Sequence, residues 1–341
     1  MVRFAGVPTV LALFLATTFT THAWANGVTV SLGANAMYSA WQPPWAGGRI
    51  MVPPYYFGLS SPAYLTPGRM VLTGRSVPVT INRFKNINGP LAGPSLSIFF
   101  LGRWSIASIF LAGKYVTRST GPVARGVTME MIPYLPAPAL VVFISSRYRR
   151  DITRYDSDST VGCKINDHLK LFLGFKYQGY RYNESSHYVT QVGAGLVTTG
   201  RARFNSYGGG LGLGVTAPLY RGLYLLVNLS GLAMYGDADY KYNKFIFYDP
   251  TSSVVLPLPC RFTGDRYWGA GGNATASFAY VFGQTGVTLA LGFRYQVLYY
   301  FWQKNNPRGF LDYYGRLDHF YGGTFSLTYS FTMGRKTGRE S

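Results

Sequence analysis

The chain has 341 residues, including 41 glycines, 28 tyrosines and 23 phenylalanines, and only 13% of its residues are charged. The charge is lopsided, with 32 Lys+Arg against 13 Asp+Glu and a formal net charge of +19. A hydrophobic fraction of 48% excludes a disordered chain, and a mean hydropathy of +0.06 is too low for a bundle of membrane helices. This composition favours a chain that crosses a membrane as β-strands.

The N-terminus has the features of a secretory signal peptide. Arg3 precedes an apolar stretch over residues 7–19, and Ala23-Trp24-Ala25 matches the A-x-A pattern of cleavage sites. The apolar stretch is short for a membrane helix, and no later apolar run reaches about 18 residues. We therefore predict a signal peptide over residues 1–25, a barrel over 26–331 and a short periplasmic tail over 332–341.

Residues 40–67 combine prolines with aromatic residues, among them Trp41, Pro43, Pro44 and Trp45. Proline is tolerated in sheets only at edges and bulges. The stretch is expected to be a loop at the rim of the barrel, or else a plug folded into its lumen. Phe110 and Phe172 are in the predicted lumen phase, so a plugged barrel that transports hydrophobic compounds is the main alternative to a channel.

From residue 92 onward, large apolar residues alternate with small or polar ones. In the segment 324–331, Phe325 and Leu327 share one face while Ser326 and Thr328 share the other. This period of two predicts strands with one wall toward lipid and the other toward a wet lumen. Strands are predicted at 92–101, 104–116, 123–133, 138–148, 155–165, 168–182, 204–216, 222–238, 268–282, 286–302 and 319–331, and candidate strands before residue 92 at 28–38, 50–58 and 68–83. The predicted fold is all-β, a transmembrane antiparallel barrel of about 14 strands, with 12 to 16 as alternatives.

Predicted connections alternate between short and long. Short turns are expected at 166–167, 217–221 and 283–286, and longer polar connections at 183–203, 239–267 and 303–318. Short turns on one rim and long loops on the other resemble Gram-negative outer-membrane β-barrel proteins, including porins, as do the signal peptide and the final aromatic strand Gly322–Phe331. The ten residues that follow Phe331 depart from this pattern. The resemblance is to the class and implies the bacterial outer membrane, lipopolysaccharide and the barrel-assembly machinery as partners.

The inward phase of the predicted strands carries charges. Charges on a lipid-facing wall cost about 2–4 kcal/mol at mid-bilayer, so the lumen is the expected location. The pore-lining residues predicted on this basis are Lys114, Glu130, Lys170, Lys176, Gln178 and Arg294. Because most are cationic, the sequence predicts a passive channel, a porin with a positively biased lumen that favours small anionic solutes. The alternative is a salt-bridge network that fills a narrow, closed barrel with a structural or surface-interaction role; a homo-oligomer is left open.

A basic cluster follows the predicted strand 138–148. Arg147, Arg149, Arg150 and Arg154 are placed at the outer rim. The planar guanidinium groups of arginine suit phosphate, so these four residues are predicted to bind lipopolysaccharide. A solvated basic loop is the alternative. The export signal argues against nucleic acid as the partner.

No pattern in the sequence predicts catalysis, a cofactor or a metal. Asp318 and His319 are adjacent, and adjacent residues of a strand point to opposite faces, so Asp318 is a poor orienter of that imidazole. His187 and the neighbouring Ser185 lie in a predicted outer loop and are expected to be chance loop residues. Cys163 and Cys260 are placed near opposite rims, so no disulfide is expected between them.

Overall fold

A computed structural model of the protein describes residues 27–42, 49–51, 78–80, 87–121, 127–129, 139–141, 143–190, 195–249, 252–254, 260–302 and 317–333. Ten strands form the barrel: β1 (Val28–Gln42), β4 (Ile87–Phe100), β5 (Trp104–Gly121), β8 (Phe143–Lys164), β9 (Leu169–Thr190), β10 (Gly195–Tyr220), β11 (Leu223–Asp249), β13 (Cys260–Val281), β14 (Val287–Trp302) and β15 (Leu317–Met333). Five further strands of three residues each are β2 (Arg49–Met51), β3 (Pro78–Thr80), β6 (Val127–Met129), β7 (Ala139–Val141) and β12 (Ser252–Val254).

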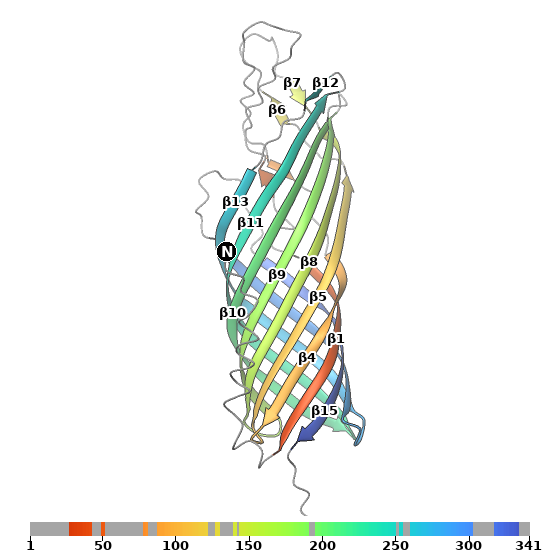
Figure 1. The fold of residues 1–341 in the computed structure, drawn as a ribbon, viewed down its shortest axis with the longest axis vertical. Coiled ribbons are helices and arrows are strands. Elements are labelled where there is room, and N and C mark those ends of the chain that lie inside the picture. The colour runs from red at the N-terminus through yellow and green to blue at the C-terminus, as the bar shows by residue number, and fades with distance from the viewer. Residues whose placement is uncertain are drawn as a thin grey trace, which may run out of the picture.

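The ten long strands close into one antiparallel barrel (Figure 1). Going round the wall, the order is β10, β9, β8, β5, β4, β1, β15, β14, β13 and β11, and β11 pairs again with β10. The first and last strands are joined along their whole length, from Val28 opposite Met333 to Gln42 opposite His319. The prediction of about 14 strands is therefore wrong, because the barrel has ten.

Strand length explains one of the four extra strands. The strands β8 to β11 run for 22 to 27 residues, far beyond the 9–11 residues that cross a bilayer. Strand β8 merges two predicted strands, and the predicted loops 183–203 and 239–267 are largely strand. Within the predicted strands 50–58, 68–83 and 123–133, the described residues form only parts of β2, β3 and β6, which pair in two separate small sheets; the remainder lies outside the described residues.

The short turns lie together at one end of the barrel, at the bottom of Figure 1. They cover residues 101–103, 165–168, 221–222 and 282–286. Gly222, Gly283 and Gly286 have φ of +74°, +50° and +72°, which only glycine adopts without strain. The predicted turns at 166–167 and 283–286 are present, and the third comes later than predicted because β10 continues to Tyr220.

The section of the wall next to these turns, here called the lower section, has its apolar residues outside. On β9 and β10 the exposed outward residues include Leu173, Phe175 and Leu211, the last with 72% of its surface exposed. Most inward positions are small or polar, for example Ser230 and Thr328, and Phe172 is among the exceptions. This distribution is that of a wall between lipid and a polar lumen.

An aromatic girdle ends the lower section. Tyr207, Tyr235 and Trp268 lie side by side on the outer face of β10, β11 and β13, with ring centroids 5.8 Å and 4.8 Å apart. Tyr177 continues the row on β9, where it is paired with Tyr207. Amphipathic rings favour the boundary between lipid and water.

Beyond the girdle, in what we call the upper section, the distribution reverses. On β10 the outward residues Arg201 and Arg203 are exposed, whereas the inward residues Ala202 and Phe204 are buried. On β9, Tyr180 and Tyr182 are likewise buried inside. The upper section has apolar side chains inside and polar ones outside, as a water-soluble barrel does. The inward side chains form an apolar core.

Among the described residues, no helix is long and apolar enough to cross a membrane. Cys163 carries a free thiol in the part of the chain that the structure describes. The predicted signal peptide lies outside the described residues, as do residues 334–341 of the predicted tail. The remaining two tail residues, Thr332 and Met333, extend β15.

Candidate functional site: a side-chain network across the lumen

Two carboxylates of β8 form the centre of a buried ion cluster. Asp158 lies directly opposite Lys176 of β9, whose ammonium Nζ is 2.8 Å from Asp158 Oδ1 and 2.7 Å from Asp156 Oδ1. Arg294 of β14 brings its Nη2 within 2.6 Å of Asp158 Oδ2 and 3.6 Å of Asp156 Oδ1. Lys176 and Asp156 are almost fully buried, so these charges depend on one another for compensation.

The contact between Asp158 and Arg294 spans the lumen. Counting through β5, β4, β1 and β15, strand β14 is the fifth neighbour of β8, and counting through β9, β10, β11 and β13 it is also the fifth. The two strands are therefore diametrically opposite in a ten-stranded wall. A 2.6 Å hydrogen bond between them leaves no open passage along that line.

A second set of hydrogen bonds crosses the lumen beside this cluster. Asp318 of β15 accepts from Trp41 Nε1 at 2.7 Å, Tyr300 Oη at 3.1 Å and Gln178 Nε2 at 3.3 Å. The side-chain oxygen Oε1 of Gln178 accepts from Gln296 Nε2 at 3.1 Å. Strands β9 and β15 are again five neighbours apart, so the bond from Gln178 to Asp318 crosses the full width of the barrel.

Arg154 connects the ion cluster to the aromatic residues. Its Nη2 is 3.4 Å from Asp156 Oδ2, and its guanidinium lies 3.8 Å from the ring centroid of Phe320 and 4.6 Å from that of Trp41. The side chain is fully buried, and its Nε and Nη1 have no hydrogen-bond partner. The two ring faces take the place of those partners, because a guanidinium stacks favourably on aromatic π-systems.

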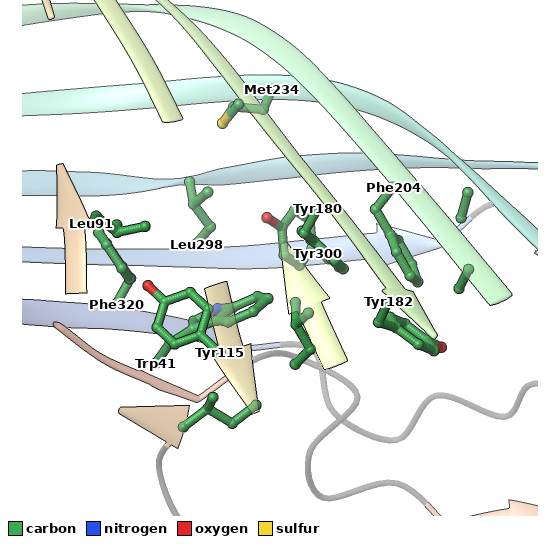
Figure 2. Packing of buried hydrophobic residues seen from close by; sticks show 14 of the residues in the cluster. Trp41, Leu91, Tyr115, Tyr180, Tyr182, Phe204, Met234, Leu298, Tyr300 and Phe320 are labelled. Carbon is green, nitrogen blue, oxygen red and sulfur yellow. The ribbon is translucent and has the colours of Figure 1, made fainter. Parts of the chain in front are cut away.

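Aromatic rings fill the lumen next to these charges, as Figure 2 shows for Trp41, Tyr115, Tyr180, Phe204, Tyr300 and Phe320. The centroids of Tyr180 and Phe204 are 4.4 Å apart in a stacked pair, and those of Trp41 and Tyr180 are 5.1 Å apart edge to face. We call the whole layer the septum, made of Trp41, Arg154, Asp156, Asp158, Lys176, Gln178, Tyr180, Phe204, Arg294, Gln296, Tyr300, Asp318 and Phe320.

The septum is formally balanced in charge. Three carboxylates, those of Asp156, Asp158 and Asp318, face three cations, those of Arg154, Lys176 and Arg294. Five of these six groups are buried and Asp158 is 27% exposed, so the buried charges are stable only if they are paired, and each cation contacts a carboxylate or an aromatic face. Within the described residues this layer has no positive bias.

The predicted pore residues separate into three groups. Lys176, Gln178 and Arg294 belong to the septum. Lys170 also faces the lumen, close to the turns, where its stem lies against Gly162. Lys114 is exposed on the outer face between the inward Gly113 and the buried Tyr115, so the prediction that it lines a pore is wrong. Glu130 lies outside the described residues.

The four arginines predicted to bind lipopolysaccharide are divided between the two faces of the wall, because all four lie on strand β8. Arg147 and Arg149 are exposed on the outer face, whereas Arg150 and Arg154 are buried in the lumen. Arg150 lies 4.1 Å from the ring centroid of Tyr182. The prediction is wrong for these two residues, since a strand sends alternate side chains to opposite faces.

The prediction for Phe110 is wrong as well, because its ring is exposed outside and stacks 6.4 Å from Tyr155. Phe172 does face the lumen, where its ring lies against Gly212.

Asp318 and His319 point to opposite faces, as expected: the carboxylate is buried in the septum, while His319 Nδ1 lies 3.1 Å from the exposed Tyr295 Oη. Among the described residues, no group of three or more His, Cys, Asp or Glu side chains is placed to hold a metal ion. Sequence reasoning missed Asp156, Asp158 and Asp318 as lumen residues, although the alternation of Asp156 and Asp158 with Ser157 and Ser159 is a period-two signal.

No protein-family model and no curated protein matches this sequence. Solved structures do match its fold. The outer membrane protease OmpT from Escherichia coli is 12% identical, with 92% of this chain and 100% of that chain covered and a TM-score of 0.39. The translocator domain of the autotransporter NalP from Neisseria meningitidis is 11% identical over 95% and 94%, with a TM-score of 0.32. A FadL homologue from Pseudomonas aeruginosa is 11% identical over 89% and 90%, with a TM-score of 0.28.

This chain resembles outer-membrane β-barrels. The likeness is one of class, and at these identities and TM-scores it carries nothing about activity or substrate.

Proposed function

We propose that this protein is an outer-membrane barrel whose lumen is closed by the septum, and that it serves as a rigid, membrane-anchored platform at the cell surface. The observation that carries the proposal is the pair of hydrogen-bonded bridges between diametrically opposite strands, Asp158 to Arg294 and Gln178 to Asp318. A solute entering the lumen meets bonded side chains from both walls at the same level.

The charge of the septum supports closure over an anion-selective pore. Like-signed, water-exposed lumen charges concentrate a counter-ion, whereas paired and buried charges do not. Lys176 and Arg294 are each held by Asp158. Moving an anion past them requires that it replace a carboxylate in a site closed to water, which is costly.

The reversed polarity of the upper section supports the platform. A barrel that only crosses the membrane needs strands of about 9–11 residues, whereas β10 and β11 have 26 and 27. Beyond the girdle these strands enclose the buried Phe204 and Ala238 and expose arginines. An apolar core of this kind makes the projecting part of the barrel rigid.

Conductance in planar bilayers tests the closed lumen. The wild-type barrel is expected not to conduct, and the triple variant Gln178→Ala/Tyr180→Ala/Arg294→Ala is expected to conduct, because it removes one end of each bridge and one ring from the septum. The matched control is Phe175→Ala/Phe293→Ala/Phe325→Ala, which removes three outward rings from the lower section. Steady ion flow through the folded wild-type barrel would overturn the proposal.

Labelling of whole cells tests the location. In a background with Cys163→Ser and Cys260→Ser, the outward Asn183→Cys in the upper section should react with a membrane-impermeant maleimide in intact cells. Thr285→Cys, in the turn 282–286, should react only after the outer membrane is permeabilised. The opposite labelling pattern would mean that the barrel has the reverse orientation in the membrane. Protection of both sites in intact cells would mean that the protein is not at the cell surface.

A gated channel is the second candidate, and the lumen of the lower section favours it. Below the septum most inward positions are small or polar, and Asn228 remains exposed to solvent there. Lys170 is the cation on this path, so anions would be the favoured solutes. Voltage-dependent openings of the wild type with anion preference would support this reading. A plug formed by residues 40–67 falls mostly outside the described residues and remains a prediction.

A further inference from the structure

The outer face of β5, β8, β9 and β10 carries a small pocket just above the girdle. Its volume is about 240 Å³, and it is bounded by Phe110, Tyr155, Tyr177, Gly179, Arg181 and Asn205. Gly179 leaves space where any other residue would place a side chain, since a Cβ there would lie 2.7 Å from the Tyr177 hydroxyl. The pocket therefore has aromatic walls and polar groups at its upper edge.

Two arginines lie close to that edge. Arg181 on β9 is the direct partner of Arg203 on β10, and both side chains are exposed on the outer face. Arg203 donates to Asn205 Oδ1 at 3.4 Å, and the Tyr177 hydroxyl donates to the same oxygen at 3.1 Å. Neither arginine forms an ion pair within 4 Å with a described residue, although Asp239 of β11 is the direct partner of Arg203 on its other side. Like charges placed directly opposite on a sheet are destabilising unless something compensates them.

The pocket lies within a larger cationic surface. On the outer face of these four strands above the girdle, the described cations are Lys114, Arg118, Arg147, Arg149, Arg181, Arg201 and Arg203, and the described acid is Asp151, paired with Arg149 at 3.2 Å. Seven positive charges less one negative charge give +6. On the adjoining wall of β11 and β13, by contrast, Arg266 lies opposite Asp237. The positive charge is thus concentrated on one side of the barrel.

The height of the pocket fits a lipid headgroup. Arg181 is four residues beyond Tyr177 along β9, about 13 Å of strand from the girdle. Lipid phosphates lie next to the interfacial aromatic residues. A separate apolar groove of about 580 Å³ lies in the lower section on the adjoining wall of β10, β11, β13 and β14, between Leu211, Leu229 and Tyr295.

We propose that this pocket binds the phosphate of an anionic lipid of the surrounding leaflet, with Arg181 and Arg203 sharing the phosphate oxygens. Guanidinium groups bind phosphate through paired, charge-assisted hydrogen bonds, and one shared anion removes the repulsion between the two arginines. Arg147 and Arg149 lie on the same face and extend the site, whereas the buried Arg150 and Arg154 have no part in it.

Lipid titration of the purified, folded protein in a neutral detergent tests the site. The probes are diphosphoryl lipid A, monophosphoryl lipid A, phosphatidylcholine and inorganic phosphate, with bound lipid counted by native mass spectrometry. The apparent Kd of the wild type should be lowest for diphosphoryl lipid A, and the variant Arg181→Gln/Arg203→Gln should weaken it about tenfold or more. The control Arg221→Gln changes an exposed arginine in the turn 221–222 and should bind as the wild type does.

A stability measurement separates a lipid site from a structural role. Without lipid, the double variant should melt at the same temperature as the wild type or higher, because it loses a like-charge pair. With lipid A, only the wild type and Arg221→Gln should gain stability. Gly179→Ala keeps both arginines and narrows the pocket, so it should bind more weakly than the wild type.

Three results would overturn the proposal. One is equal lipid binding by the double variant and the wild type, and another is an equal loss in the Arg221→Gln control. The third is saturation of the site by inorganic phosphate alone, which would make it a site for the free ion.

Discussion

The lower and upper sections of the barrel are built from the same strands but place their apolar residues on opposite faces of the wall. On β10, Leu211 and Leu213 face outward in the lower section and Phe204 faces inward in the upper section. Below the girdle the apolar side chains face lipid. Above the girdle the outer face meets water, so the apolar side chains pack against one another inside the barrel. The comparison teaches that one uninterrupted strand can change the side on which its apolar residues lie, with the aromatic girdle marking the change.

The septum lies where the two sections meet. Asp158 and Lys176 are level with the girdle residue Tyr177 on the other face of the wall. Above this level the lumen is filled by apolar rings and below it by small polar residues. Charged groups at this boundary can be compensated by one another, and the barrel is closed there by side chains that reach across its width.

The largest effect is expected from breaking the ion cluster. Asp156→Asn keeps the size of the side chain but leaves Lys176 and Arg154 short of a buried carboxylate. Loss of one partner from a buried ion cluster costs about 3–5 kcal/mol, so the free energy of unfolding in urea should fall by that amount. The control Asp151→Asn removes an exposed carboxylate, also from β8 and also paired with an arginine, and should cost under about 1 kcal/mol. Equal losses for the two variants would contradict a buried cluster.

The apolar core of the upper section should respond almost as strongly. Phe204 is fully buried, and its ring stacks on Tyr180, so Phe204→Ala should cost about 3–5 kcal/mol in the same urea titration. Arg201→Ala changes an exposed residue of the same strand and section, and it should stay within about 0.5 kcal/mol. A small loss for Phe204→Ala would mean that the upper lumen is wet rather than packed.

A charge scan on the outer face sharpens the boundary between the sections. Leu211→Arg places a cation in the lipid-facing belt, which costs about 2–4 kcal/mol near mid-bilayer. Asn183→Arg makes the same addition on the outer face of the upper section and should be nearly neutral, because that face meets water. The measurement is the urea midpoint of barrels folded into lipid vesicles. If the two variants lost the same stability, the belt would have to extend over both sections.

The alternation of single strands predicts the class of fold but not the number of strands. The segment 324–331 and the turn 283–286 follow from local pattern and turn chemistry, and both are where the sequence places them. At the end of the segment 183–203, the outward Arg201 and Arg203 alternate with the inward Ala202, which is the reverse of the lipid-facing pattern, so a template for a lipid-facing wall predicts a loop there. The extra predicted strands have other sources: β8 is predicted as two strands, and the described parts of the predicted strands 50–58, 68–83 and 123–133 do not join the barrel wall.

The septum could not be predicted because it depends on closure. Asp158 and Arg294 are 136 residues apart, and they meet only because they lie on opposite strands of a wall with ten members. A barrel of 14 strands is wider, so the same side chains would line an open channel. Lys176 and Arg294 were placed in the lumen by their phase alone, whereas their pairing needed the correct strand number.

The smallest effect is expected outside both sections, in the turn 165–168. Asp167 is fully exposed, and its carboxylate accepts a hydrogen bond from Lys164 Nζ at 2.7 Å, which lowers the pKa of Asp167 below its usual 3.8. A folded-state pKa below the unfolded value gives stability that is present above the unfolded pKa and lost as the pH falls through the folded one. Asp167→Asn should therefore leave the urea midpoint unchanged at pH 7 to within measurement error, and it should remove a shallow loss of stability below about pH 4. A clear destabilisation at neutral pH would show that the charges of the turn stabilise the end of the barrel. The exposed pair and the buried cluster of Asp156 would then differ only in how much stability they contribute.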